Sequence, residues 1–240
     1  MYLFCLWFLI FLSYSFLGYI VEVISCSLNE HKLVLNRGFC LGPYLPIYGF
    51  SCIIITLLLV RYREDPFVVF VMGAFISTVM EYFTSLILEK IFGSRWWDYS
   101  DKKFNICGRV CLENSFLFGI GGFFCLYVIS PFLVHIYLSM PEWLLITISL
   151  VLLIAFVTDV IITIITLVKV KIASQEFKKK DATAEIRAMI KKELLNHSLL
   201  IRHMLNAFPR LRKASDDNIL ARLKQYLDKL MKNQLNHKKK

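Results

Sequence analysis

Five long apolar stretches are the feature that most limits what this chain of 240 residues can form. A helix needs about 20 apolar residues to cross the roughly 30 Å hydrocarbon core of a bilayer, where unpaired backbone groups are too costly. The segments that meet or approach this length are Tyr2–Ser27, Leu45–Val60, Pro66–Glu89, Ser115–Leu138 and Trp143–Val168. We therefore predict an all-α membrane protein, built as a bundle of five transmembrane helices.

The composition excludes the other broad classes of protein. Hydrophobic residues make up 57% of the chain and charged residues 19%, whereas a soluble domain has about 45–50% and about 25%. Long disorder is excluded because the chain contains 20 Phe, 11 Tyr and 4 Trp. An integral membrane protein remains.

The net charge of +10 is concentrated at one end of the chain. Residues 1–169 contain 10 Lys and Arg against 11 Asp and Glu, a net charge of −1, whereas residues 170–240 contain 18 against 7, a net charge of +11. We expect a transmembrane domain over residues 1–169 and a basic cytoplasmic tail over residues 170–240. The nearly neutral body gives no reason to expect nucleic acid as a partner.

The tail has the spacing of two amphipathic helices. Apolar residues recur at helical intervals from Ile186 to Phe208, and Pro209 ends the run. A second run from Leu220 to Leu230 follows Ser215, which suits a helix N-cap. This pattern predicts a helical hairpin or coil, and adsorption to anionic membrane lipids is the alternative.

Basic residues in the loops predict the orientation in the membrane. The first and third loops of the body contain seven Lys and Arg, and the other two contain only Arg61 and Arg63. Because basic loops stay in the cytoplasm, we predict an external N-terminus and a cytoplasmic C-terminus.

Acidic residues inside the apolar segments are the first candidates for a function. Glu22, Glu81 and Asp159 lie in the first, third and fifth segments, and an acid at the bilayer centre costs about 2.5–3.5 kcal/mol on insertion scales. We predict a polar cavity, open to the cytoplasm, that these acids line. In the alternative, the acids are structural, protonated and hydrogen-bonded to Ser or Thr neighbours.

Small and basic residues around the acids extend this hypothesis. Ser77, Glu81, Ser85 and Glu89 recur every four residues and share one helix face. Arg37, Arg95 and Arg109 lie in the two basic loops and could clamp a phosphate or carboxylate, or instead neutralise Glu89, Asp98 and Asp101. The run of glycines from Gly119 to Gly122 predicts a close helix-packing surface.

Several ordered motifs resemble those of the CmpB-type putative ABC-transporter permease family of bacterial membrane proteins. The resemblance covers about residues 10–160. Its motifs are Tyr14-Ser15-x-x-Gly18-Tyr19-x-x-Glu22, Asn36-Arg37-Gly38-Phe39-x-x-Gly42-Pro43-Tyr44-x-Pro46-Ile47-Tyr48-Gly49, Glu81-x-x-Thr84-Ser85, Glu89-Lys90-x-Phe92, Arg95-Trp96-Trp97-Asp98-Tyr99-Ser100 and Asn105-x-x-Gly108-Arg109.

The resemblance implies a permease-like transport component of the bacterial cytoplasmic membrane. It would work with a separate ATPase subunit, because the sequence contains no Walker A motif, or as a homodimer, with membrane lipids around it. The resemblance does not identify a substrate, and the residues do not identify a cofactor or a metal. The cavity or ligand-binding candidates are Glu22, Asn36, Arg37, Glu81, Ser85, Glu89, Arg95, Trp97, Asp98, Asn105, Arg109 and Asp159.

Two other functions remain open from the sequence. The chain could be a membrane-embedded enzyme for a phosphorylated or lipid substrate, in which Glu22 or Glu81 is the base and the arginines bind phosphate. It could also be a non-catalytic membrane scaffold whose tail recruits partners.

Overall fold

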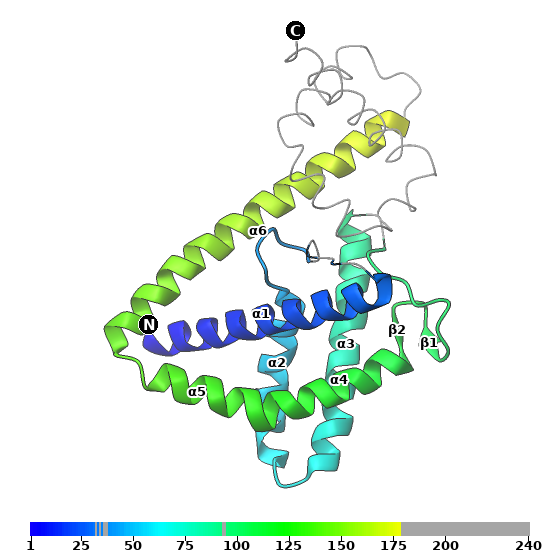
Figure 1. Ribbon diagram of the computed structural model, residues 1–240. Helices are drawn as coiled ribbons and strands as arrows, with labels where there is room; N and C mark the ends of the chain where they lie inside the picture. The colour runs from blue at the N-terminus through cyan, green and yellow to red at the C-terminus, as the bar shows by residue number, and fades with distance from the viewer. Residues whose placement is uncertain (32, 34, 36–37, 93–94, 179–240) are drawn as a thin grey trace. The chain divides into compact units, whose positions relative to one another are not determined.

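The computed structural model describes residues 1–31, 33, 35, 38–92 and 95–178, and these are mostly helical (Figure 1). The predicted helices of the tail lie outside the described residues. The elements in chain order are α1 (Tyr2–Glu30), α2 (Pro46–Leu59), a 3-10 turn η1 (Val60–Tyr62), α3 (Pro66–Phe92), β1 (Asn105–Ile106), β2 (Val110–Cys111), α4 (Leu112–Phe124), a π-helical segment η2 (Cys125–Ile129), α5 (Ser130–Leu138) and α6 (Glu142–Lys178).

Four helices are long and apolar enough to cross a membrane, namely Tyr2–Leu28, Pro66–Phe92, Leu112–Leu138 and Glu142–Val168. They coincide with four of the five predicted segments. The second predicted segment forms α2, which has 14 residues and is followed by the three residues of η1. At about 1.5 Å per residue they rise roughly 25 Å, which is less than the hydrocarbon core.

The described chain divides into two compact units. The larger one contains Met1–Ile87 and Trp97–Ile161, and the smaller one contains Leu88–Trp96 and continues from Ile162. Both hydrophobic clusters described below belong to the larger unit.

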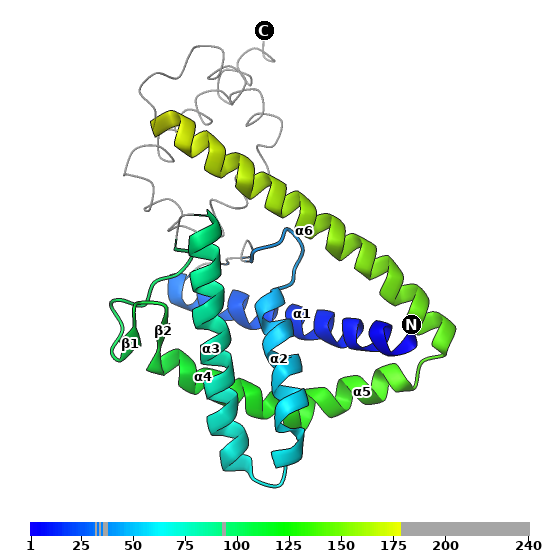
Figure 2. The ribbon, with the colours of Figure 1, turned by 180° about the vertical axis from the view of Figure 1, so that it is seen from behind.

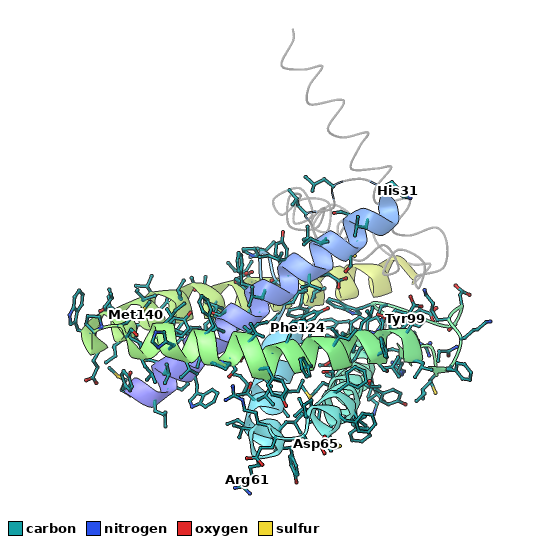
Figure 3. All side chains as sticks on the ribbon, turned by 60° about the horizontal axis from the view of Figure 1, so that its bottom comes forward. His31, Arg61, Asp65, Tyr99, Phe124 and Met140 are labelled. Atoms are coloured by element: carbon teal, nitrogen blue, oxygen red, sulfur yellow. The ribbon has the colours of Figure 1, made fainter. Side chains whose placement is uncertain are left out.

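The turn between α2 and α3 follows from local chemistry. Asp65 accepts the backbone N–H groups of Phe67 and Val68, both at 3.1 Å, and Pro66 stands at the first helical position. An Asp cap followed by Pro is a strong signal for a helix start. As a result α2 and α3 run side by side in opposite directions, with Arg61 and Asp65 at the turn between them (Figures 2 and 3).

Two apolar clusters hold the helices of the larger unit together. One joins α1 to the η2–α5 region and the start of α6 through Tyr14, Cys125, Leu133 and Leu145. The other joins α2 and α3 to η2 through residues that include Ile55, Val69 and Leu126. The π-helical segment therefore contributes to both clusters.

Glycines bring α3 and α4 close together. A Cβ atom on Gly73 would lie 3.6 Å from the Cα atom of Gly122, and Gly119 packs under the ring of Phe70. The glycine run therefore forms the close packing surface that its composition predicts, although Gly121 has no heavy atom within 4 Å of its Cβ position.

Candidate functional site

A buried polar face on α3 carries the central residue of the site. Ser77, Glu81 and Ser85 are all buried, and Glu81 is only 6% exposed. They lie at four-residue intervals, so they face one side of the helix. This face is where the sequence predicts it.

Glu81 has few hydrogen-bond donors for a buried carboxylate. Its Oε1 atom accepts the hydroxyl of Tyr99 at 3.1 Å, while its Oε2 atom is buried and has no hydrogen-bond partner among the described residues. An uncompensated buried charge costs several kcal/mol. A neutral hydroxyl that lacks one hydrogen bond costs about 1–3 kcal/mol, so a carboxyl in this position favours its neutral form.

Glu22 on α1 is held by two donors. The Sγ atom of Cys26, one turn further along α1, donates to its Oε1 atom at 3.3 Å. The hydroxyl of Tyr48, near the start of α2, donates to its Oε2 atom at 3.4 Å.

The position of Tyr48 depends on the absence of a side chain at Gly18. A Cβ atom on Gly18 would overlap the ring of Tyr48. Gly18 precedes Glu22 by four residues, so the ring lies along the face of α1 that also carries Glu22. The ring can therefore lie against the backbone of α1 while its hydroxyl reaches the carboxylate.

The two glutamates and the two tyrosines form one group, which we call the acid–phenol cluster: Glu22, Tyr48, Glu81 and Tyr99. Both carboxylates interact electrostatically with Tyr48 and with Tyr99, and with each other. Burial, and then the charge of Glu81, raises the pKa of Tyr99 above its ordinary value. Tyr99 therefore remains a neutral donor to Glu81.

The segment after α3 brings Tyr99 to Glu81 on that helix, through the hydrogen bond between their side chains. Its shape is set by a short hairpin in which Asn105 pairs with Cys111 and Ile106 with Val110. The backbone N–H of Tyr99 donates to the carbonyl of Gly108 at 2.7 Å.

Three candidate residues act within this segment. Asn105 donates to the carbonyl of Lys102 at 2.8 Å and accepts the N–H of Gly108 at 3.0 Å. The indole of Trp97 donates to the carbonyl of Arg109 at 2.9 Å. Asp98 accepts both the backbone N–H and the hydroxyl of Ser100. These contacts lie within the segment and fix its shape, while the hydroxyl of Tyr99 joins it to α3.

Arg109 and Arg95 both have internal partners. The guanidinium of Arg109 donates to the hydroxyl of Ser85 at 3.1 Å and lies over the ring of Tyr82, 5.8 Å from its centre. In the smaller unit, Arg95 pairs with Glu89 at 3.3 Å.

Asp159 on α6 binds the chain just before α2. Its carboxylate accepts the backbone N–H groups of Leu41 at 3.0 Å and Gly42 at 2.8 Å, and also the hydroxyl of Tyr44. Burial, then the hydrogen bond to Asp159, raises the pKa of Tyr44, and burial with the charge of Asp159 raises the pKa of Cys40 to about 12. Asp159 therefore anchors a loop.

The structure thus brings Glu22, Glu81, Ser85 and the segment from Trp97 to Arg109 together. Asn36 and Arg37 lie outside the described residues. The sequence did not single out Tyr48, Tyr99 or Tyr44 as site residues, because their acidic partners are remote in sequence and no periodic pattern connects them.

In the described part of the chain, no group of three His, Cys, Asp or Glu side chains could hold a metal ion.

Comparison with protein families gives one match. The CmpB model, described as putative ABC-transporter type IV, matches residues 9–164. Neither the curated proteins nor the solved structures give a match.

Proposed function

This chain belongs to the CmpB-type family described as putative ABC-transporter type IV, and on that premise we propose that it is the permease-like component of a membrane transport system. The match and the four apolar helices make it an integral membrane protein. The proposal adds that a small solute or lipid passes through a cavity that faces the cytoplasm.

One observation carries the proposal. Glu22 and Glu81 meet in one cluster inside a membrane-embedded body, and neither forms an ion pair with a described residue. Acids in a membrane interior are expensive and mark pathways for ions or substrates. We place these two acids in the cavity wall, with the 97–109 segment over them and Asp159 anchoring the loop before α2.

We further propose that α2 and η1 cross the membrane as a fifth span. An odd number of spans puts the N-terminus outside and the C-terminus in the cytoplasm, as the basic loops favour. Reporter fusions at Asp101 should then be cytoplasmic and fusions at Glu64 external. An external position for Asp101 would contradict this topology.

The energy source would be a separate ATPase subunit, as the family's description as an ABC transporter suggests. Five spans are few for a permease, so we propose that two copies assemble. The basic tail would lie along the lipid headgroups or recruit partners.

The contacts of the arginines support transport over an enzyme that binds phosphate. Arg109 is engaged with Ser85 and Tyr82, and Arg95 with Glu89. A phosphate clamp would require both guanidinium groups to leave these partners.

Purification from native membranes in mild detergent, followed by native mass spectrometry, tests the proposal. We expect an ATPase subunit to co-purify with wild type, Glu81→Gln and the control Glu113→Gln, whose residue is an exposed acid paired with Lys102. ATP turnover of the complex should change in Glu81→Gln alone. A protein that carries no ATPase would contradict the proposal and favour the scaffold.

A further inference from the structure

The unpartnered oxygen of Glu81 is the starting point for a specific ligand. This residue is only 6% exposed, and its Oε2 atom has no hydrogen-bond partner in the described part of the chain. The other oxygen has one donor, Tyr99. A full negative charge here would have a single neutral hydroxyl to stabilise it, since none of the described basic side chains pairs with it.

The ionisable groups that interact with Glu81 come from three elements. They are Glu22 from α1, Tyr48 from α2, and Tyr99 from the segment after α3, while Cys26 joins the group through its hydrogen bond to Glu22. The nearest turn of α3 towards the loop carries Ser85, whose hydroxyl accepts from Arg109. Two acids, two phenols and a thiol therefore lie together, and no basic side chain among the described residues forms an ion pair with either carboxylate.

A cation is the ligand class that such a cluster requires, because only positive charge offsets two buried acids. A divalent metal needs more protein ligands than the described residues bring together. The Oε2 atom is closed off from solvent, so a hydrated ion or an organic ammonium group does not reach it in this conformation. A proton needs no added volume.

We infer that Glu22 and Glu81 together hold one exchangeable proton, carried on Oε2 of Glu81. Tyr99 donates to Oε1, which leaves Oε2 to form the O–H bond. Glu22 is the more exposed acid of the pair and already accepts hydrogen bonds from Cys26 and Tyr48. It is also the group through which the proton enters and leaves.

This inference deepens the proposed function, and it rests on that function in treating the cluster as the working site of a transporter. A proton that is bound while the cluster is closed and released when it opens would link the conformational cycle to proton movement. The inference also gives a role to Glu81, a buried carboxyl whose Oε2 atom accepts no hydrogen bond from the described residues.

Infrared spectroscopy of the purified full-length protein in lipid nanodiscs tests the inference, because a protonated carboxyl has its own carbonyl stretching band. At neutral pH we expect this band in wild type and in the control Glu113→Gln. It should be lost in Glu81→Gln. Absence of the band from wild type, or its survival in Glu81→Gln, would overturn the inference, as would loss of the wild-type band on adding sodium or potassium ions.

A second variant keeps the test decisive if Glu81→Gln does not fold. Tyr99→Phe removes the donor that stabilises charged Glu81, so the band should persist to a higher pH than in wild type. An unchanged titration would contradict the assignment. The readout needs neither an ATPase nor a transported solute. A protein without an ATPase partner but with the band would refute the proposed function and leave the proton site standing.

Discussion

The backbone N–H of Gly42 donates a 2.8 Å hydrogen bond to the carboxylate of Asp159, which lies 117 positions further along the chain. The same carboxylate takes the N–H of Leu41 and the hydroxyl of Tyr44. One acid on α6 thus holds the loop that leads into α2.

Replacing Asp159 by Ala should destabilise the protein substantially. The change leaves two backbone donors and one hydroxyl without their acceptor, and hydrogen bonds to charged groups contribute about 1.5–3 kcal/mol each. We expect a loss on the order of 3 kcal/mol in thermal unfolding in detergent, and faster proteolysis within residues 38–45. Tyr44→Phe, which removes one of the three bonds, is the matched control and should cost about a third as much. Equal stability of Asp159→Ala and wild type would show that the anchor contributes nothing.

The thiol of Cys40 should resist alkylation at mildly alkaline pH. Cys40 is fully buried, and its pKa is raised from 9.0 to about 12, so little thiolate is present. Cys107, which is exposed, should react much faster when a maleimide is followed by mass spectrometry of peptides. Asp159→Asn removes the second cause of the shift and should speed labelling of Cys40. Labelling of Cys40 at the rate of Cys107 would refute this account.

The same shift makes stability depend on pH with a definite sign. A thiol with a raised pKa in the folded state binds its proton more tightly than in the unfolded state. Its contribution is therefore complete below pH 9 and is lost as the pH rises from 9 towards 12. Cys40→Ala should show a flatter decline in melting temperature over that range, and an unchanged decline would assign the effect elsewhere.

An added methyl group at Gly18 should disturb the acid–phenol cluster. The new Cβ atom overlaps the ring of Tyr48, so the ring must shift away from α1, at a cost of about 1–3 kcal/mol. Gly121→Ala is the control, because its Cβ would meet no heavy atom within 4 Å and Ala favours a helix by about 1 kcal/mol over Gly. Melting temperatures should therefore move in opposite directions, and a fall of similar size in both variants would contradict the overlap.

Arg109 and Ser85 should be energetically coupled. A double-mutant cycle with Arg109→Ala and Ser85→Ala should give a coupling of about 1–2 kcal/mol, because the single changes remove the same hydrogen bond. The hydrogen bond from Trp97 survives, since it ends on the backbone of Arg109. A cycle that pairs Ser85→Ala with Lys102→Ala should give no coupling, as Lys102 bonds to Glu113. Coupling near zero for both cycles would show that the hydrogen bond between Arg109 and Ser85 does not stabilise the protein.

Apolar length predicted the long helices well, and it failed where other forces set the boundaries. α2 begins at Pro46, whose ring suits a first helical position, and it gives way to η1 after Leu59. α6 continues to Lys178, ten residues beyond the predicted Val168, because Lys, Ala, Gln and Glu favour helix after the apolar run ends.

The site was predictable in its acids and not in their partners. Spacing alone put Glu81 on a polar face with Ser77 and Ser85. The donors of Asp159 are backbone N–H groups, which every residue except Pro has, so nothing in the sequence marks Leu41 or Gly42 as its partners. The sequence predicted that Asp159 lines a cavity with the two glutamates, because all three lie in apolar segments. Its contacts show instead that it binds the loop before α2.

The π-helical segment η2 also affects which neighbours the side chains after it can contact. A π-helical turn contains one residue more than an α-helical one, and each residue turns a helix by about 100°. Leu126 packs with the α2–α3 cluster, while Leu133 packs with α1 and α6. An extra residue in the helix would rotate every later side chain by about 100° relative to the earlier ones. Relatives that lack it would need a different set of apolar positions in α5 to bury the same neighbours, so an alignment gap here would mark a change of packing partners.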